Sequence, residues 1–426
     1  AGLVNVPRLK GVHYAIESGR LAAEAAFRTL QRGEVPSRVG ALDSYDESQL
    51  VFPTGGRTAA GAYPDPAYID QALALLGKAE KPVALVGSQL FWSKRRDAYA
   101  PFVEQFGMPV YVNGQARGSL PPEHPNFFTR TRKEALRGAD VILIFGTPLD
   151  FRLGYGRASH LNPAAKLIQV DLDGGEIGRN RHVDVGIPGD TGMVMAALSA
   201  AATGMPRGGS PAVREWARGL RVKEAERFEQ MRPELESDTT PINPLRLCKE
   251  IDAVLDDDTI VIGDGGDFVA TAASVLRIAK IGQWLDPGPL GTLGVGPGYA
   301  MAAKLARPGS NVIIVYGDGA FGLNGLEYEA LARQKINVVG VIGNDAAWMQ
   351  IRRGQVEIYG EERSIATKLD FTHYEKVAEA VGAHGEYVEE PGKIRPALER
   401  ALGCGKPALV NVRLGVSEFR KGAISI

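Results

Sequence analysis

Short apolar runs alternate with amphipathic stretches along most of this chain. The first four runs, each flanked by residues at helical spacing, lie at 83–87, 109–112, 141–146 and 167–173. Continuous β-branched runs of this length are typical of parallel strands that helices cover on both faces. The pattern predicts an α/β domain over residues 66–202.

A second alternating unit is predicted over residues 241–426, with strands at 259–262, 311–316, 338–342 and 408–412. Residues 203–240 between the two units are rich in charge and predict a solvated linker helix. The predicted fold class is therefore α/β, with two doubly wound parallel-sheet domains.

The first 65 residues have a different pattern. Residues 1–50 predict one amphipathic helix, because apolar side chains recur at helical spacing from Leu21 to Leu30 and Gly33 ends the run. Residues 51–65 lack periodicity and are rich in Gly and Pro, which predicts a linker.

Composition excludes several classes of protein. Lys and Arg total 49 of 426 residues against 50 for Asp and Glu, which argues against nucleic-acid and membrane-surface partners. The two cysteines are far apart, so neither a disulfide scaffold nor a zinc cluster is expected. No apolar run reaches the roughly 18 residues of a membrane span. We expect a reducing, cytoplasmic location.

The clearest chemical signal is the turn Gly317-Asp318-Gly319, which ends an apolar run and precedes a helix expected to begin near Gly322–Leu326. Ligands of open α/β sheets lie at the carboxyl ends of strands, where glycines and free helix amides accommodate phosphate. An acid in such a turn would repel a diphosphate unless a divalent cation lay between them. Mg²⁺ prefers oxygen ligands, so a second one is expected from a neighbouring strand.

The next apolar run supplies such a ligand, because it ends in Asn344-Asp345. Asp345 comes 27 residues after Asp318, which accommodates one helix and one strand. A right-handed crossover of that length can place the two strand ends side by side. A second Gly-Asp-Gly turn lies at 263–265. Leu290 and Gly291 follow its Asp at the separations at which Asn344 and Asp345 follow Asp318, and neither has a side chain that binds a metal. We therefore expect this turn to line the site without binding the metal.

These residues resemble the thiamine-diphosphate motif of the decarboxylase and acetolactate-synthase superfamily. The resemblance implies thiamine diphosphate and Mg²⁺ as cofactors. It assigns the metal to the side chains of Asp318 and Asp345 and the carbonyl of Ala347, with Asn344 as the ligand if the alignment shifts by one residue. The residues it implies for cofactor binding are Gly291, Thr292, Leu293, Gly317, Asp318, Gly319, Ala320, Asp345, Ala347, Trp348, Asp267 and Phe268.

The glycine-rich segment Gly291-Thr292-Leu293-Gly294 resembles the part of the family motif that cradles the aminopyrimidine ring. Leu293 would be the wedge that bends the cofactor, and the carbonyl of Gly291 would accept from its amino group. Asp267 and Phe268 match a turn near the diphosphate, although an Asp suits phosphate poorly.

Residues 66–202 are similar to the middle domain of the same enzymes. The segment 146–156 resembles the acyl-CoA branch, oxalyl-CoA decarboxylase and 2-hydroxyacyl-CoA lyase, which implies CoA or ADP as a ligand. Acetolactate synthases bind FAD with a related segment, so FAD is an alternative. Nucleotide phosphates could meet Arg152, Arg157, Arg179 and Arg181. The tail at 418–422 resembles the segment that closes the active site.

Enzymes of this family usually begin with a pyrimidine-binding domain that carries an activating glutamate, and we find no match to it here. The catalytic residue is therefore unknown. Residues 1–50 instead resemble a fragment of the electron-transfer flavoprotein–ubiquinone oxidoreductases. We therefore expect these residues to be a foreign segment that replaces the first domain. Active sites in this family form between subunits, so we expect a homo-oligomer or a partner chain that supplies the missing domain.

The resemblance implies a lyase, ligase or decarboxylase of carbon–carbon bonds that acts on 2-hydroxyacyl-CoA, oxalyl-CoA or 2-oxo acid substrates. Acetolactate-synthase-like carboligation is the alternative within the family. A cofactor-binding remnant without activity is the alternative from another class.

Overall fold

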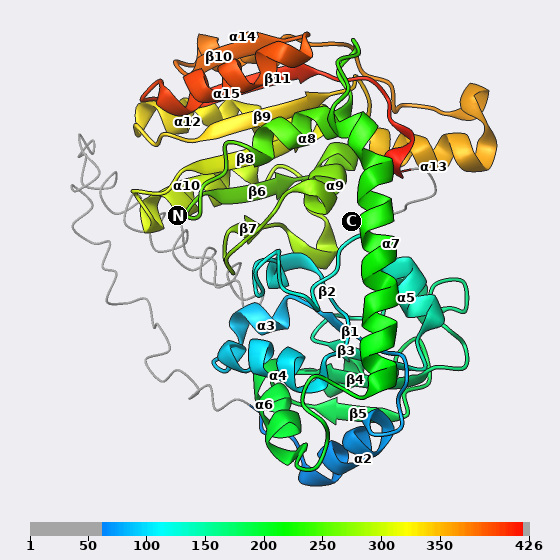
Figure 1. Cartoon of the computed structure of the whole chain (residues 1–426). Coiled ribbons are helices and arrows are strands. Elements are labelled where there is room, and N and C mark those ends of the chain that lie inside the picture. The colour runs from blue at the N-terminus through cyan, green and yellow to red at the C-terminus, as the bar shows by residue number, and fades with distance from the viewer. Residues whose placement is uncertain (1–61, 421–426) are drawn as a thin grey trace, which may run out of the picture. The chain divides into compact units, whose positions relative to one another are not determined.

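The computed structural model describes residues 62–420. The predicted foreign fragment at 1–50, all but the last four residues of the predicted linker at 51–65, and the last six residues of the chain lie outside the described residues. The described part contains two parallel β-sheets, one before and one after the long helix α7 (Pro211–Leu235) (Figure 1). The predicted α/β class with two parallel-sheet domains is confirmed.

The first sheet has the strand order β2-β1-β3-β4-β5. Its strands are β1 (Pro82–Val86), β2 (Val110–Val112), β3 (Val141–Phe145), β4 (Lys166–Asp171) and β5 (Val185–Pro188). Neighbouring strands pair in parallel, and the central strands β1 and β3 are buried along their whole length. Burial on both faces explains their continuous apolar sequences.

Helices cover both faces of this sheet. Side chains on one face pack against α2 (Pro66–Leu76), α3 (Gln89–Trp92), α4 (Tyr99–Phe106) and α6 (Thr191–Ala201). The other face packs against α5 (Arg132–Gly138), the loops after it and Leu220 of α7. The start of α2 is fixed by the Asp65 side chain, which accepts from the amide of Ala67, and by proline in the first turn.

The second sheet has the order β10-β11-β9-β8-β6-β7. Its strands are β6 (Ile260–Asp264), β7 (Trp284–Leu285), β8 (Val312–Gly317), β9 (Val339–Asn344), β10 (His384–Val388) and β11 (Ala408–Arg413). The strand order reverses direction along the sheet beside β6 and β8. In open sheets of this kind such a point carries the ligand site, at the carboxyl ends of the strands.

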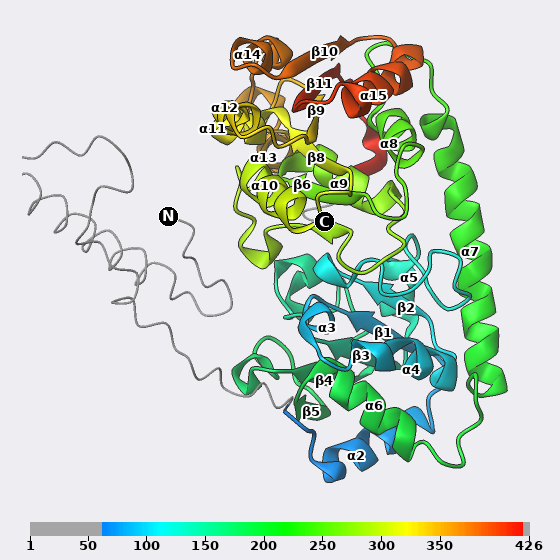
Figure 2. The same ribbon diagram turned by 90° about the vertical axis from the view of Figure 1, so that its left-hand side faces the viewer.

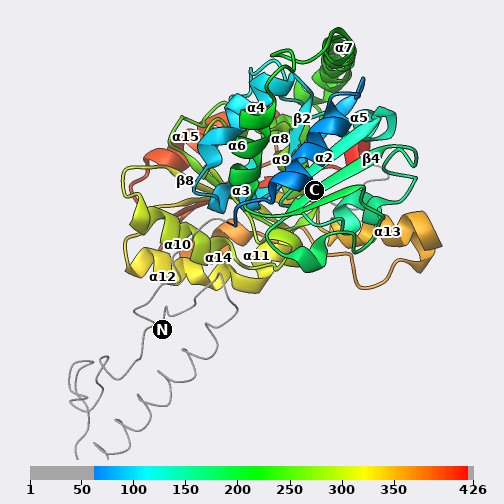
Figure 3. The ribbon, with the colours of Figure 1, turned by 90° about the horizontal axis from the view of Figure 1, so that it is seen from below.

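Two layers of helices enclose this sheet (Figure 3). One layer consists of α8 (Pro244–Asp252), α9 (Gly266–Val275) and α15 (Ile394–Gly403). The other layer consists of α10 (Gly296–Ala306), α11 (Asp318–Asn324), α12 (Tyr328–Arg333) and α14 (Tyr374–Ala380), whereas α13 (Met349–Tyr359) lies at the carboxyl edge. Short 3₁₀ turns join the elements, at Arg96–Ala98, Gly114–Ala116, Phe151–Gly156, Gly174–Glu176, Gly288–Leu290, Gly325–Glu327, Glu361–Arg363, Pro391–Lys393 and Glu418–Arg420.

The structure differs from the sequence patterns at several elements. Strands β5, β7 and β10 were not predicted, because β7 has two residues and β5 and β10 are only partly buried edge strands. Helix α11 begins at Asp318 itself and not near Gly322–Leu326. The acidic residue is therefore part of the first helical turn, where it meets the positive end of the helix dipole.

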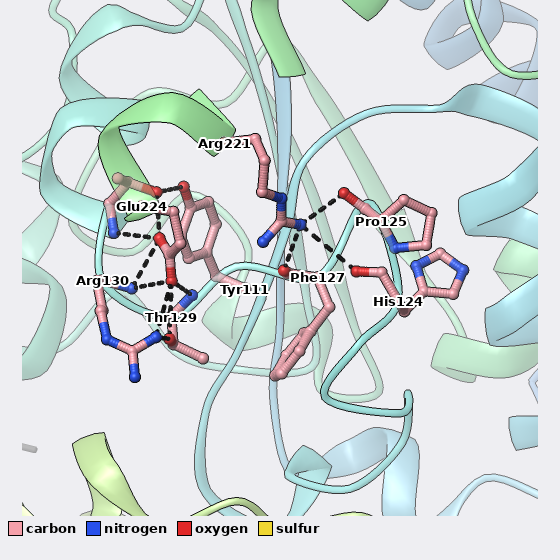
Figure 4. A network of polar contacts seen from close by, with 9 residues as sticks. Tyr111, His124, Pro125, Phe127, Thr129, Arg130, Arg221 and Glu224 are labelled. Atoms are coloured by element: carbon pink, nitrogen blue, oxygen red, sulfur yellow. Dashed lines mark hydrogen bonds and ion pairs between the residues drawn. The ribbon is translucent and has the colours of Figure 1, made fainter. Parts of the chain in front are cut away.

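Helix α7 is more than a solvated linker, because it extends alongside both sheets (Figure 2). Glu224 is 6% exposed, and its carboxylate accepts from the amides of Thr129, Arg130 and Thr131 and from both threonine hydroxyls (Figure 4). One turn earlier, Arg221 donates to backbone carbonyls of the same loop and lies over the Phe128 ring. The helix thus fixes the loop that leads into α5.

Within residues 62–420, the helices are too short or too polar to pass through a lipid bilayer.

Candidate functional site

Three strand ends meet at the carboxyl edge of the second sheet. Strands β8 and β9 are neighbours, with Gly317 opposite Gly343, so the turns that carry Asp318 and Asp345 leave the sheet side by side. On the other side of β8, Asp264 of β6 pairs in register with Tyr316. The crossover inferred from the 27-residue separation is therefore present.

A cavity of about 280 Å³ lies at this edge. Of the residues expected at the cofactor site, it is lined by Asp267, Phe268, Gly291, Leu293, Gly317, Asp318, Gly319, Ala320, Asp345, Ala347 and Trp348. Thr292 and Asn344 do not line it. Thr292 is exposed, and Asn344 is fully buried beneath the turn.

The carboxylate of Asp318 is 1% exposed. Its Oδ1 accepts from the amide of Gly319 at 2.8 Å, and its Oδ2 accepts from the amide of Ala347 at 3.1 Å. Burial raises the pKa of Asp318 to about 6, although these amides oppose the shift. The side chain therefore connects the turn after β8 to the turn after β9 and retains unsatisfied negative charge.

Asp345 is the second acid of this pair. Burial raises its pKa well above the usual range, and the charges of Asp318 and then Asp267 raise it further. The charge of Asp318 thus disfavours ionisation of Asp345, and a cation placed between the two carboxylates would stabilise both charged forms.

The side chain of Asn344, unlike that of Asp345, is directed away from the cavity. Its Nδ2 donates to the carbonyl of Thr372 and to Oδ1 of Asn411, each at 3.1 Å. Asn411 in turn donates to the buried carboxylate of Glu375 at 2.8 Å. Because these contacts occupy the Asn344 amide below the sheet edge, Asp345 is the side chain of the two that reaches the cavity.

The turn after β9 has an unusual backbone. Ala346 has φ +53°, a left-handed conformation that non-glycine residues rarely adopt. It reverses the chain so that Ala347 faces Asp318 and Trp348 packs over Gly319. A Cβ on Gly319 would lie 2.6 Å from the Trp348 ring, so this close approach requires glycine.

Three helices begin at the cavity without a side-chain cap. They are α9, α11 and α13, and residues of the first turn of each line the cavity. Uncapped amides and the positive ends of helix dipoles favour an anion such as a phosphate group. The cavity therefore combines paired carboxylates with anion-binding helix ends.

The other Gly-Asp-Gly turn has a supporting role that the sequence did not indicate. Both carboxylate oxygens of Asp264 accept backbone amides, from Gly294 at 2.8 Å and Gly296 at 2.7 Å. These bonds hold the loop that carries Leu293. A Cβ on Gly265, which has φ +69°, would lie 1.9 Å from Leu293 Cδ2, so the side chain occupies space that only glycine leaves open.

Asp267 is neutralised by two arginines. Its Oδ2 lies 3.0 Å from the guanidinium of Arg353 on α13, and its Oδ1 lies 3.2 Å from that of Arg420. This pairing removes the conflict that an acid near a phosphate would cause. It also joins the turn at 418–420 to the cavity wall, whereas residues 421 and 422 of the expected closing segment lie outside the described residues.

The first domain contributes a wall that sequence reasoning largely missed. The residues are Asn113, Gly114, Arg117, Phe151 and Arg152. Of these only Arg152 was singled out, for nucleotide phosphates, and it forms a two-pronged pair with Asp150. Of the other arginines proposed for that role, Arg181 donates to the carbonyls of Gly156 and Asn162, and Arg179 pairs with Glu176.

Two models of known protein families match this chain, one over each sheet domain. Residues 69–198 match the thiamine pyrophosphate enzyme central domain, and residues 264–412 match the thiamine pyrophosphate enzyme C-terminal TPP binding domain. The second match includes the turns after β6, β8 and β9.

Several curated proteins are similar to 84% or more of this chain. Identity is 39% over 360 residues to the acetolactate synthase large subunit IlvG of Mycobacterium tuberculosis, covering 64% of that protein. It is 37% over 371 residues to 2-hydroxyacyl-CoA lyase 2 of Caenorhabditis elegans and 34% over 372 residues to the human protein of that name, covering 57% of each. The chain thus spans less than two thirds of the length of these relatives. With its central and C-terminal TPP binding domains, it belongs to the thiamine pyrophosphate enzyme family.

Proposed function

We propose that the protein is a thiamine-diphosphate- and Mg²⁺-dependent enzyme that cleaves or forms carbon–carbon bonds. The observation that carries the proposal is the convergence of the carboxylates of Asp318 and Asp345 with three uncapped helix ends in one cavity. Carboxylates suit a hard cation, and free helix amides suit the phosphates that such a cation bridges.

The metal would be held by Asp318, Asp345 and the carbonyl of Ala347. The raised pKa values of the two acids support this assignment, because a cation between them would offset the burial of both and the repulsion of Asp345 by Asp318. Asn344 is the weaker candidate ligand, since its amide already binds Thr372 and Asn411.

The diphosphate would meet the first turns of α9 and α11, at Gly266, Asp267, Phe268, Gly319 and Ala320. The ring system would rest on Leu293, whose position is supported by Asp264 through the amides of Gly294 and Gly296. Gly291 lines the cavity beside Leu293 and would offer its carbonyl. Thr292 is exposed and would contribute only backbone.

When bound, thiamine diphosphate would supply an electron sink that lets a carbonyl carbon act as a carbanion equivalent while a carbon–carbon bond to it breaks or forms. The residues of this chain would orient the cofactor and exclude water with Trp348, Phe151 and Met349, which line the cavity. Among residues 62–420 no glutamate lines it. The activating glutamate would therefore come from outside these residues, and a second subunit is the source we propose.

For the substrate we propose a 2-hydroxyacyl-CoA or a related acyl-CoA, with 2-oxo acid carboligation as the alternative. Relatives named 2-hydroxyacyl-CoA lyase 2 and acetolactate synthase both support this range, since both names imply chemistry at a carbonyl carbon. A nucleotide such as ADP or FAD in the first domain stays a prediction of the sequence.

Circular dichroism titration with thiamine diphosphate, with and without Mg²⁺, tests cofactor binding. We expect saturable binding that requires the metal. Exchange of the cofactor C2 proton, monitored by NMR, then separates an enzyme from an inactive remnant. Metal-independent or absent binding contradicts the proposal, and binding without exchange contradicts the activity of this chain alone.

Product analysis distinguishes the two substrate classes. Release of an aldehyde and a one-carbon acyl-CoA from a 2-hydroxyacyl-CoA would support the lyase, whereas acetolactate formed from pyruvate would support the carboligase.

A further inference from the structure

The loop between β7 and α10 carries Gly291 and Leu293, which we propose to meet the cofactor rings. It contains one 3₁₀ turn, Gly288–Leu290, and Leu290 is 82% exposed. Gly288 and Gly291 have φ of +68° and +59°, conformations that glycine adopts without strain. The loop buries little surface of its own, so its position depends on the groups that hold its two ends.

The end of the loop next to α10 is held from two sides. Asp264 of β6 accepts from the amides of Gly294 and Gly296. Asn324 of α11 donates from Nδ2 to the carbonyl of Gly294 at 2.6 Å. This end is therefore fixed by a strand and by a helix of the second domain.

The end next to β7 is held by a different acid, Asp286, which is 8% exposed and lines the cofactor cavity. Its Oδ1 accepts from the amide of Gly288 at 2.9 Å, and its Oδ2 accepts from the indole Nε1 of Trp284 at 2.7 Å. Because the two oxygens bind different donors, the carboxylate connects the start of the 3₁₀ turn to strand β7.

Trp284 is a rigid anchor for this carboxylate. It is 1% exposed and pairs in register with Val261 of β6. A Cβ on Gly263 would lie 3.1 Å from its ring, so the ring packs directly against the backbone of β6. The guanidinium of Arg117, from the first domain, lies over the same ring at 5.2 Å from its centroid. The indole N–H therefore has little freedom to move, and it fixes the direction of the carboxylate that it binds.

The charge of Asp286 is balanced in part by Arg117. Burial lowers the pKa of Arg117 to about 10, and the charge of Asp286 opposes this shift. The acid thus has an N–H donor on each oxygen and a cation nearby, which suits a group that holds backbone in place.

We propose that Asp286 is a positioning residue for the cofactor rings. By binding Trp284 and Gly288 together, it places the loop so that the Gly291 carbonyl and Leu293 meet the rings. This inference rests on the proposed function, in which those two residues contact the rings. The metal and the diphosphate would meet other elements, the turns after β8 and β9 and the first turns of α9 and α11. Loss of Asp286 should therefore weaken ring binding and spare the diphosphate.

Isothermal calorimetry of the full chain, in saturating Mg²⁺ at constant ionic strength, tests this with two probes. Thiamine diphosphate has the rings, and inorganic pyrophosphate shares only the metal and phosphate contacts. We expect Asp286→Ala to weaken thiamine diphosphate binding about tenfold, because both hydrogen bonds are lost, and to change pyrophosphate affinity by less than about twofold. Asp286→Asn should recover part of the loss, since its amide oxygen still accepts from Gly288 but its NH₂ group cannot accept from the indole. Asp70→Asn is the control for net charge, because Asp70 is exposed on α2 and does not line the cavity.

A loss confined to thiamine diphosphate supports the proposal. Equal losses for both probes would indicate a general loosening of the site and overturn it, as would an unchanged affinity of Asp286→Ala for thiamine diphosphate. If Asp286→Ala does not fold, Asp286→Asn carries the same comparison, with a severalfold loss expected for thiamine diphosphate alone. Failure of the native chain to bind thiamine diphosphate would contradict the proposed function, and this inference with it, before any variant is compared.

Discussion

The molecule contains the same tripeptide, Gly-Asp-Gly, at the ends of two adjacent strands. At β6 the Asp264 carboxylate accepts hydrogen bonds from two amides of the loop at 294–296, and Asp264 does not line the cavity. At β8 the Asp318 carboxylate also accepts two amides, yet it lines the cavity beside a second carboxylate. One acid positions a loop, and the other forms half of a charged pair.

The difference arises from the segment that each turn faces. Asp264 faces a neutral, glycine-rich loop, and the amides of Gly294 and Gly296 donate to its two carboxylate oxygens. Asp318 faces the turn after β9, where Ala346 bends the backbone and brings Asp345 toward it. A tripeptide therefore indicates a buried acid at a strand end, and the neighbouring turn decides its chemistry.

The largest expected effect is that of Asp318→Asn on cofactor binding. We expect the affinity for thiamine diphosphate in the presence of Mg²⁺ to fall at least about a hundredfold, because the metal loses a charged ligand and an amide cannot accept from both Gly319 and Ala347, so the two turns are no longer joined. Circular dichroism titration at fixed Mg²⁺ measures this loss. Asp264→Asn is the internal control, since it removes the same charge one strand away. Equal losses in both variants would show that the two turns share one role.

The raised pKa of Asp318 also predicts that the free energy of unfolding of the cofactor-free chain depends on pH. Its pKa in the folded chain, about 6, lies above the ordinary 3.8, so the stability it contributes is fully present below about pH 4 and is lost as the pH rises through 6. Between pH 4 and 8, the free energy of unfolding of the native chain should therefore fall by roughly 2.5 kcal/mol relative to Asp318→Asn. Urea unfolding at both pH values measures it, and a constant difference contradicts the assignment.

Asp264→Asn should have the next largest effect on the cofactor, about a tenfold loss of affinity. An amide cannot accept from both Gly294 and Gly296, so one buried N–H loses its partner and the Leu293 loop loosens. The metal requirement should persist, because Asp318 and Asp345 are intact. The Mg²⁺ dependence of the titration checks this, and loss of that dependence would refute a purely positional role.

Asp345→Asn should have a smaller effect on cofactor affinity, severalfold, since an amide oxygen still reaches the metal although the charge is lost. Asn344→Ala serves as its comparison. It should lower stability through the lost bonds to Asn411 and Thr372, with little direct effect on the metal. Mg²⁺ titrations and urea unfolding of both variants separate the roles, and the reverse outcome would make Asn344 the ligand.

The fold class and one side of the cavity were accessible from the sequence, because continuous apolar runs and acidic turns are local signals. Asp318 and Asp345 could be paired since a crossover constrains the separation of neighbouring strands. The wall formed by Asn113, Arg117 and Phe151 could not be predicted from the sequence, because it depends on how one domain packs against the next. The burial of Asn344 was also inaccessible, since its partner Asn411 lies 67 residues later on β11.

Glu224 extends the comparison to a carboxylate for which hydrogen bonds outweigh burial. Burial alone would raise its pKa, but the amides of Thr129 and Arg130 and the threonine hydroxyls together lower it below 4.5. Asp318 and Glu224 are both buried acids, yet one destabilises the folded chain at neutral pH and the other stabilises it. The sign follows the balance between burial and hydrogen bonds: burial prevails at Asp318, and hydrogen bonds prevail at Glu224.

Glu224→Gln should leave cofactor affinity unchanged, the smallest effect in this series, and lower the free energy of unfolding by about 2 kcal/mol at pH 7. Because the folded pKa is lowered, this stability is present above the unfolded pKa of 4.5 and is lost as the pH falls through the folded value. Urea unfolding at pH 7 and below pH 4 should show the gap between native chain and variant closing, opposite in direction to Asp318→Asn. Glu226→Gln, at an exposed position of the same helix, is the control. If the gap stays constant with pH, the loop is not fastened by the charge of Glu224.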